Sequence, residues 1–479
     1  MKKVILVFCV FAFATSHSQI VQGSTKTYKK RVLESTEVDF LSSYYQQKGD
    51  NASVTGGIGT EHLTDIASSI IISMPLDEDR VLTIDAGISA YTSASSSNGN
   101  PFDRSGASRS GDDDDDDDRY NNGPTTGTPW DASTGASKSD VWGTIGVDYS
   151  NSSDDRNFIW NANASFANEY DYTSFGFGFG FLKQFNEKNT TVGINGKVYL
   201  DTWIPIYPTE LKSYQEVNGN LNQGFFSGIT ILDQNGNANT NYKPLNGFEL
   251  IKNKGRNSFS SSVSFSQILS KNAQVSFFVD FVLQKGLLAN PLQRVYFSDV
   301  ANYYIGNASS IPIYTNKSNK DVFQLADDIE RLPSSRFKLP IGVRFNYYIN
   351  ENFTIRTYYR YYFDDWGINS HTASIEIPIK ITDKFTLYPS YRFYNQTAAD
   401  YFRPYEGALS TDEFYTSDYD LSEYSANQFG FGISYTDIFT KAHVWKFGLK
   451  SIDLKFYQYD RDTSFSSNII TAGFKFIMD

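Results

Sequence analysis

The chain has 479 residues, a formal net charge of −12 and an aromatic content of 16%. The consecutive residues Asp112–Asp118 supply seven of the negative charges, so the acidity is local, and the sequence lacks the basic footprint of a nucleic-acid-binding protein. The single cysteine, Cys9, lies in an apolar N-terminal stretch, and the remaining chain has no thiol for a disulfide, catalysis or zinc binding.

The N-terminus has the pattern of a secretory signal peptide over residues 1–18. Lys2 and Lys3 precede the apolar stretch Val4–Thr15, which is too short to span a membrane, and Ser16-His17-Ser18 offers a small-residue cleavage site. Residues 19–35 are expected to form a short periplasmic segment. Beyond it no apolar run approaches the 18 residues of a transmembrane helix.

Residues 36–479 contain about sixteen strand-like segments with alternating short and long connections. Five connections are long and polar: Asp50–Leu63, Thr92–Ser139, Pro205–Gly255, Gly286–Arg336 and Thr397–Asp420. The connections after Met74, Ser150, Gln184, Leu269, Ile349, Ile381 and Asp437 are short turns. Long loops at one end and tight turns at the other are typical of an outer-membrane barrel. The sequence therefore predicts an all-β, transmembrane antiparallel β-barrel with extracellular loops and both termini in the periplasm.

Period-two alternation supports this fold. Phe175, Phe177, Phe179 and Phe181 alternate with glycines, and Ile470–Met478 alternates up to the C-terminus. Strands of about ten residues with one apolar face suit a membrane wall. Val444–Tyr459 changes phase once, which predicts a β-bulge; fourteen or eighteen strands remain alternatives to sixteen.

Several stretches resemble a family of bacteroidete outer-membrane barrels catalogued as a domain of unknown function. The matching stretches are Leu63–Ser69, Met74–Arg80, Glu330–Pro333, Asp364–His371 and Tyr415–Asp420. The resemblance implies a barrel in the outer membrane and no particular reaction. Genes of this family are thought to lie near a flavin-transfer enzyme, a thioredoxin-like protein and a small lipoprotein, which hints at an envelope redox or modification system.

Charged residues at inward-facing positions divide by sign along the chain. Asp39, Asp85, Asp148 and Asp280 fall on earlier strands. The basic residues fall on later strands: Lys338, Arg344, Arg356, Arg360, Lys380, Arg392, Lys446 and Lys450, with Lys197 and Glu376 as exceptions. Opposed walls of charge would select ions in an open lumen. Alternatively, the charges pair across a closed interior, or loops fill the bore.

Two groups of acidic residues are candidates for binding calcium, whose preferred ligands are oxygens. The first group is expected at the extracellular rim and comprises Asp171, Asp364, Asp365, His371, Asp418 and Asp420, with Glu169, His62 and Asp65 nearby. The second is the acidic loop Asp112, Asp113, Asp114, Asp115, Asp116, Asp117 and Asp118. The alternatives are turn caps and salt bridges for the rim, and a solvated, disordered loop for the acidic run.

No nucleophile elbow, phosphate loop or metalloprotease motif occurs in a suitable context, so we expect no enzymatic activity. Residues Asp321–Leu332 have helical apolar spacing and predict a short amphipathic helix that could plug the barrel. The sequence leaves two hypotheses. One is a channel or transporter for small polar or anionic solutes; the other is a non-conducting scaffold whose loops bind a lipoprotein or secreted partner. Expected partners are outer-membrane lipid, lipopolysaccharide and the barrel assembly machinery, with no nucleic acid and no cofactor except, in the rim hypothesis, calcium.

Overall fold

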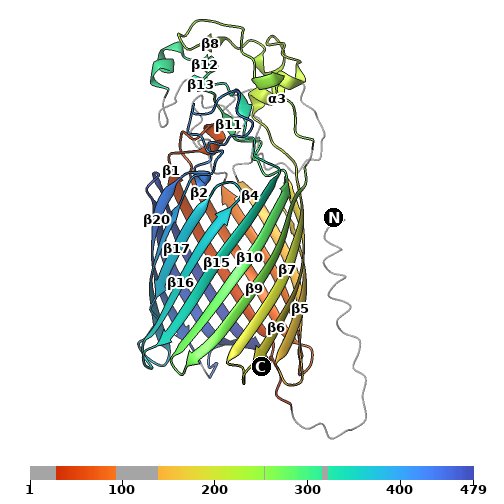
Figure 1. The fold of residues 1–479 in the computed structure, drawn as a ribbon, viewed down its shortest axis with the longest axis vertical. Coiled ribbons are helices and arrows are strands. Elements are labelled where there is room, and N and C mark those ends of the chain that lie inside the picture. Colours follow the sequence, from red (N-terminus) through yellow and green to blue (C-terminus); the bar gives the residue numbers. More distant parts are fainter. Residues whose placement is uncertain (1–28, 93–138, 253, 315–321, 438, 479) are drawn as a thin grey trace.

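The computed structural model describes residues 29–92, 139–252, 254–314, 322–437 and 439–478. Sixteen long strands form one closed antiparallel barrel in which each strand pairs with its neighbours in the chain, and the last strand pairs with the first (Figure 1). The predicted fold and the predicted number of strands are confirmed. Within the described ranges, no helix is long and apolar enough to cross a membrane.

The barrel strands are mostly 11–15 residues long. In chain order they are β1 Glu37–Gly49, β2 Leu63–Pro75, β3 Arg80–Thr92, β4 Ser139–Ser152, β5 Phe158–Asn168, β6 Tyr172–Phe185, β7 Thr190–Trp203, β9 Arg256–Ser270, β10 Ala273–Gly286, β15 Ser335–Tyr348, β16 Thr354–Asp364, β17 Asn369–Glu376 (continued by β18 Ile379–Lys380), β19 Phe385–Gln396, β20 Tyr424–Thr436, β22 Phe447–Arg461 and β23 Phe465–Met478. A two-residue strand, β21 His443–Val444, pairs with β22 at the turn.

Apolar side chains cover the outside of the barrel. Phe175, Phe177, Phe179 and Phe181 of β6 are 43–54% exposed, and the register places Phe175 directly opposite Phe166 of β5. The intervening Gly176, Gly178 and Gly180 face the lumen, where Ser165, Asn163 and Asn161 stand opposite them. A closed barrel satisfies every backbone hydrogen bond within the sheet, so its apolar exterior can face lipid.

The seven short turns lie together at one end of the barrel, here called the turn end, and the long loops leave the opposite, loop end (Figure 1). The predicted phase slip is also confirmed, since the pairing of β22 with β23 shifts between Leu449 and Ser451. Trp445, expected within that strand, instead occupies the turn before β22 with a φ of 57°.

Four loops at the loop end pack together into a cap that lies over the barrel (Figure 1). The cap consists of residues 50–62, 204–255, 287–334 and 397–423, as far as they are described. Its elements are short: η1 Ser53–Thr55, α3 Thr209–Glu216, η3 Gly224–Phe226, β8 Ile231–Asp233, η4 Leu245–Gly247, β11 Arg294–Val295, β12 Tyr303–Gly306, η5 Ala308–Ile313, β13 Val322–Gln324, β14 Asp328–Ile329 and η6 Tyr419–Leu421. Strands β8, β12 and β13 form one small sheet, and β11 pairs with β14.

The buried apolar residues of the described chain lie almost entirely in the cap. They form four clusters, the largest around Phe226, Tyr242 and Phe323. Those outside the cap, Trp366, Ile368, Tyr424, Ala426 and Phe465, are at the same end of the barrel. The cap is therefore a second folded unit, with a core of its own.

A buried ion pair joins three loops of the cap. Arg294 donates from Nε to Glu210 Oε1 at 2.7 Å and from Nη1 to the carbonyl oxygen of Val54 at 2.9 Å. The side chains of Arg294 and Glu210 are fully buried. The guanidinium thereby connects the β1–β2, β7–β9 and β10–β15 loops.

The prediction of a helix over Asp321–Leu332 is wrong. Val322–Gln324 and Asp328–Ile329 are short strands, and Val322, Leu325, Ala326 and Ile329 are all buried in the cap. These side chains contact apolar partners on both faces of an extended segment. Apolar residues therefore recur at intervals that match the period of a helix, although the segment is not helical.

Candidate functional site

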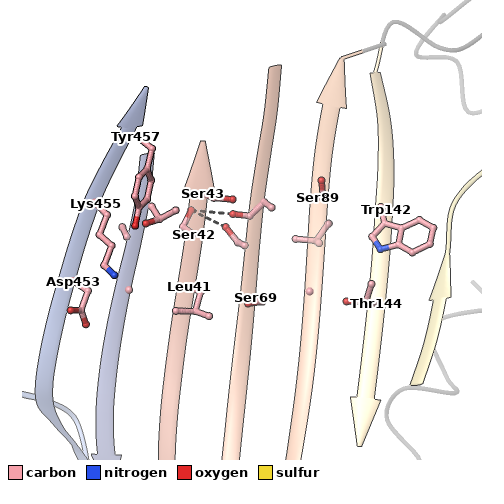
Figure 2. Close-up of a pocket in the computed structure, with 17 residues that line it drawn as sticks. Leu41, Ser42, Ser43, Ser69, Ser89, Trp142, Thr144, Asp453, Lys455 and Tyr457 are labelled. Carbon is pink, nitrogen blue, oxygen red and sulfur yellow. Dashed lines mark hydrogen bonds between the residues drawn. The ribbon is translucent and has the colours of Figure 1, made fainter. Parts of the chain in front are cut away.

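The lumen has one wall of mostly small side chains on β23, β1, β2 and β3, flanked by β22 and β4. A concavity of about 690 Å³ follows this wall. Figure 2 shows Asp453, Lys455 and Tyr457 on one flank and Trp142 and Thr144 on the other, with Leu41, Ser43, Ser69 and Ser89 among the residues between them. The short side chains leave the lumen wide along these strands.

The lumen face of β15, β16 and β19 carries Arg344, Arg360 and Arg392, with tyrosines at neighbouring positions. Arg344 lies 5.7 Å from the ring centre of Phe278 and 5.5 Å from that of Tyr358. The Nε atoms of Arg360 and Arg392 are shielded from solvent without a hydrogen-bond partner among the described residues. None of the three guanidiniums forms a salt bridge with a described carboxylate. Uncompensated positive charge of this kind favours anions.

The acidic residues predicted to face the lumen lie mainly on the other side. Asp39 is 3.7 Å from Lys475 Nζ, and Asp148 accepts a hydrogen bond from Asn161 at 3.0 Å. Asp85 stands opposite Gly146, and Asp280 stands opposite Ser262. These carboxylates are spread over β1, β3, β4 and β10.

Other basic residues predicted to face the lumen lie toward the turn end and mostly have local partners. Arg356 pairs with Glu376 at 2.9 Å, and Lys380 pairs with Asp383 at 2.8 Å. Lys450 lies 3.6 Å from Glu37. Lys446 belongs to the turn before β22, with its Nζ 5.9 Å from the ring centre of Trp445. These side chains therefore contribute less free charge than Arg344, Arg360 and Arg392.

A second cavity, of about 300 Å³, lies where the cap meets the barrel, and we call it the junction chamber. Barrel strands and the β16–β17 turn contribute Trp203, Arg256, Gln284, Arg336, Lys338 and Trp366. The cap contributes Leu288, Asn290, Gln293, Glu330, Leu332, Asp418, Asp420 and Leu421. The chamber is thus built from residues distant in sequence at the boundary between the two units.

Burial perturbs the acids of the junction chamber. Glu330 is 3% exposed, and burial followed by the nearby Asp418 raises its pKa to about 8. Its carboxylate accepts hydrogen bonds from the backbone N–H of Asn290 and from the hydroxyl of Thr416, each at 2.5 Å. Burial and the neighbouring Asp420 likewise raise the pKa of Asp418.

The residues predicted to form a rim calcium site have separate partners. Asp171 accepts from Trp203 Nε1 at 3.0 Å, Asp364 pairs with Arg336, Asp365 accepts from the backbone of Phe337, and Asp420 pairs with Arg461 at 2.6 Å. His371 lies on the outer face, where its Nδ1 is 2.7 Å from the hydroxyl of Tyr359. Within the described ranges, no three His, Cys, Asp or Glu side chains form a group that could hold a metal ion.

Two sequence predictions lie outside the described residues. These are the acidic loop Asp112–Asp118 and the signal peptide 1–18. Of the expected periplasmic segment 19–35, residues 29–35 are described, and Lys29 Nζ contacts Asp79 and Asp154 at 2.6 Å each beside two turns.

Sequence reasoning missed most of the junction chamber. Arg256, Gln293 and Trp203 carry no motif, and only the nonlocal packing of loops brings them together. Three stretches singled out by family resemblance, Glu330–Pro333, Asp364–His371 and Tyr415–Asp420, do supply chamber residues. That resemblance was the available signal for this site.

A closed sixteen-stranded barrel with an apolar exterior and a charged lumen defines a transmembrane β-barrel of the outer-membrane class. The chain belongs to the family described as "Protein of unknown function (DUF3570)", which matches residues 9–461. The expected membership of a family of unknown function is thereby confirmed. No curated protein matches the chain.

Several solved structures are similar to the chain in fold. A bacterial polysaccharide outer membrane secretin is 8% identical with a TM-score of 0.40, and the match covers 93% of this chain and 98% of that one. A mutant of the ferric enterobactin receptor PfeA from Pseudomonas aeruginosa is 10% identical, with a TM-score of 0.38 and coverages of 90% and 55%. A FadL homologue from Pseudomonas aeruginosa is 9% identical, with a TM-score of 0.37 and coverages of 93% and 91%. These likenesses are too distant to bear on function.

Proposed function

We propose that the protein is an outer-membrane channel or transporter that passes small polar or anionic solutes and catalyses no reaction. The observation that carries this proposal is the set of unpaired lumen arginines, Arg344, Arg360 and Arg392. Without a carboxylate partner, these guanidinium groups leave net positive charge along the lumen, and such charge attracts a passing anion.

The arrangement of charge around the barrel supports the same proposal. In the order of pairing, β15, β16 and β19 are the tenth, eleventh and thirteenth strands, whereas β1, β3 and β4 are the first, third and fourth. In a ring of sixteen, these two groups lie across the lumen from each other. Basic and acidic walls on opposite sides create a transverse field that orients polar solutes and selects between ions.

We infer that the cap is extracellular and that the turns and the chain termini are periplasmic. Outer-membrane barrels have short periplasmic turns and long outer loops. In this orientation a solute entering the cell meets the cap first, then the junction chamber and then the arginines.

Planar-bilayer conductance tests the proposal. The unmodified protein should conduct and prefer chloride over potassium under a salt gradient, and the double variant Arg360→Glu with Arg392→Glu should shift the reversal potential toward cation preference. Lys271→Glu, an exposed change in the β9–β10 turn, is the matched control for net charge. A folded, inserted protein that passes neither ions nor a small sugar in liposome swelling would refute an open conduit.

A second candidate function is a non-conducting scaffold whose cap binds a lipoprotein or secreted partner. The core of the cap favours it, because a rigid unit with four apolar clusters can present a fixed surface. Crosslinking in intact cells from cysteines placed on the cap, at Asn222 and Asn241, would detect such a partner. The control is a cysteine substituted for Lys271, at the turn end of the barrel. Crosslinks at both cap positions but not at Lys271, in a protein that does not conduct, would favour the scaffold.

A further inference from the structure

The charges of the junction chamber are divided between the barrel and the cap. Its three cationic side chains, Arg256, Arg336 and Lys338, come from strands β9 and β15. Its three carboxylates, Glu330, Asp418 and Asp420, come from cap loops. A solute inside therefore faces basic groups from the barrel and acidic groups from the cap, of which Glu330, with a pKa of about 8, is mostly protonated near neutral pH.

The barrel side of the chamber has two cations available for a ligand. Arg336 is occupied, because its Nη2 lies 2.5 Å from Asp364 Oδ2 and its guanidinium stacks 4.3 Å from the ring centre of Trp366. Arg256 and Lys338 form no salt bridge with any described residue; Arg256 lies 5.7 Å from the ring centre of Trp203. Two unpaired cations in a confined space are suited to a carboxylate.

The cap side of the chamber has an acceptor site suited to a cationic donor. Gln293 is 6% exposed, and its Oε1 accepts no hydrogen bond from the described residues. Its Nε2 donates to Asp418 Oδ2 at 3.4 Å, so the free oxygen lies beside a carboxylate. A buried acceptor without a donor is costly, and an ammonium group would satisfy both Gln293 and Asp418.

The other two carboxylates are already engaged. Glu330 accepts from Asn290 and Thr416, and Asp420 pairs with Arg461 at 2.6 Å. Their hydrogen bonds fix the cap loops around the chamber. Asp418 Oδ1 accepts from the backbone N–H of Asp420 at 2.9 Å, so the groups left to face a ligand are Asp418 Oδ2 and Gln293 Oε1.

We propose that the junction chamber binds a small zwitterion of the free α-amino acid class, with its carboxylate on Arg256 and Lys338 and its ammonium group on Asp418 and Gln293 Oε1. The volume of about 300 Å³ admits a molecule of this size and excludes a folded peptide. A simple anion would leave Gln293 without a donor, and a simple cation would leave Arg256 and Lys338 without a counter-charge. This inference rests on the proposed conduit and names the class of solute that passes through it.

Calorimetric titration of the full chain in detergent micelles tests the proposal with three probes. L-glutamine carries both charges, L-glutamine amide lacks the carboxylate, and N-acetyl-L-glutamine lacks the ammonium group. L-glutamine should bind with a Kd below about 1 mM, and each blocked analogue should bind at least about tenfold more weakly.

Two variants separate the two ends of the ligand. Arg256→Gln should weaken binding of L-glutamine about tenfold and leave binding of L-glutamine amide unchanged. Gln293→Leu should weaken L-glutamine about tenfold and leave N-acetyl-L-glutamine unchanged. Lys271→Gln, at the turn end, is the charge-matched control, and retention of the compact band in unheated gels shows that each variant has folded.

Conductance separates failure of this inference from failure of the proposed function. A protein that conducts but binds none of the probes, or binds all three equally, overturns the amino-acid site and leaves the conduit standing. A protein that binds L-glutamine with the expected dependence on both charges but does not conduct supports the site and overturns the conduit.

Discussion

The barrel and the cap solve the problem of apolar surface in opposite ways. The barrel turns Phe175, Phe177 and their neighbours outward, and in the described chain its interior contains no apolar core. The cap turns Phe226, Tyr242 and Phe323 inward and forms four clusters away from lipid. The barrel is thus adapted to lipid and the cap to water. A charged substitution on the outer face should destabilise the barrel, whereas loss of a buried contact should destabilise the cap.

Arg294→Leu should have the largest effect and should act on the cap alone. It leaves Glu210 as an unpaired buried charge, which costs about 3–5 kcal/mol. Hydrogen exchange in lipid nanodiscs should accelerate in residues 204–252 and 287–314 while the barrel strands stay protected. Adding Glu210→Leu should restore most of the protection. Equal acceleration in the strands would show that the two units unfold as one.

Phe177→Arg should act on the barrel alone. A charged side chain at the centre of the lipid-facing band of β6 costs about 2–4 kcal/mol. Urea unfolding in lipid vesicles measures this loss. Thr144→Arg, on a lumen-facing position of β4, is the matched control and should cost less than about 1 kcal/mol. If Thr144→Arg lowers the free energy of unfolding as much as Phe177→Arg does, the assignment of lipid-facing and lumen-facing positions is wrong.

The cap, unlike the barrel, should lose stability as the pH rises. Burial raises the pKa of Glu330 to about 8 and those of Glu61 and Asp327 to about 7, so the folded cap holds protons that unfolded loops would release. Their contribution is complete below about pH 4 and is lost as the pH rises through 7 and 8, by up to about 1.4 kcal/mol per pH unit for each group. Hydrogen exchange of cap peptides, corrected for intrinsic rates, should show this trend. Glu330→Gln should flatten it, and an unchanged slope in that variant would contradict the assignment.

His371→Phe should have the smallest effect. The side chain lies on the outer face beside Tyr359 and Tyr361, so its loss removes one hydrogen bond and costs less than about 1.5 kcal/mol. Calcium and zinc titrations should be the same for the variant and the unmodified protein. Loss of a cation-binding step in the variant would support the rim calcium site that the sequence suggested.

The barrel could be predicted because its strands and turns depend on residues that are close together in the sequence. Alternation in Tyr172–Phe185 and the short turns follow from period two and from turn composition, and even the irregularity near Leu449 could be anticipated. The same alternation indicated which charged residues occupy lumen-facing positions. It could not indicate which arginines lack a partner, because the partner of Arg356 lies on a neighbouring strand whose register the sequence alone leaves open.

The cap and the junction chamber were not predictable in this way. Val322–Ile329 has helical spacing but is extended, because its side chains pack against loops distant in sequence. Asp364 and Asp418, grouped by topology as calcium ligands, bind Arg336 and Gln293 instead. Such contacts depend on tertiary packing, which has no periodic signature in the chain.

The contact between Arg294 and Val54 has a consequence for biogenesis. The two residues are 240 positions apart, and their loops follow β10 and β1, the ninth and first strands of the ring. Contacts between such distant segments form late. We therefore expect the cap loops to cross the membrane as unfolded polypeptide. They should fold only after the first and last strands of the barrel have paired. A folded cap would then indicate that insertion is complete.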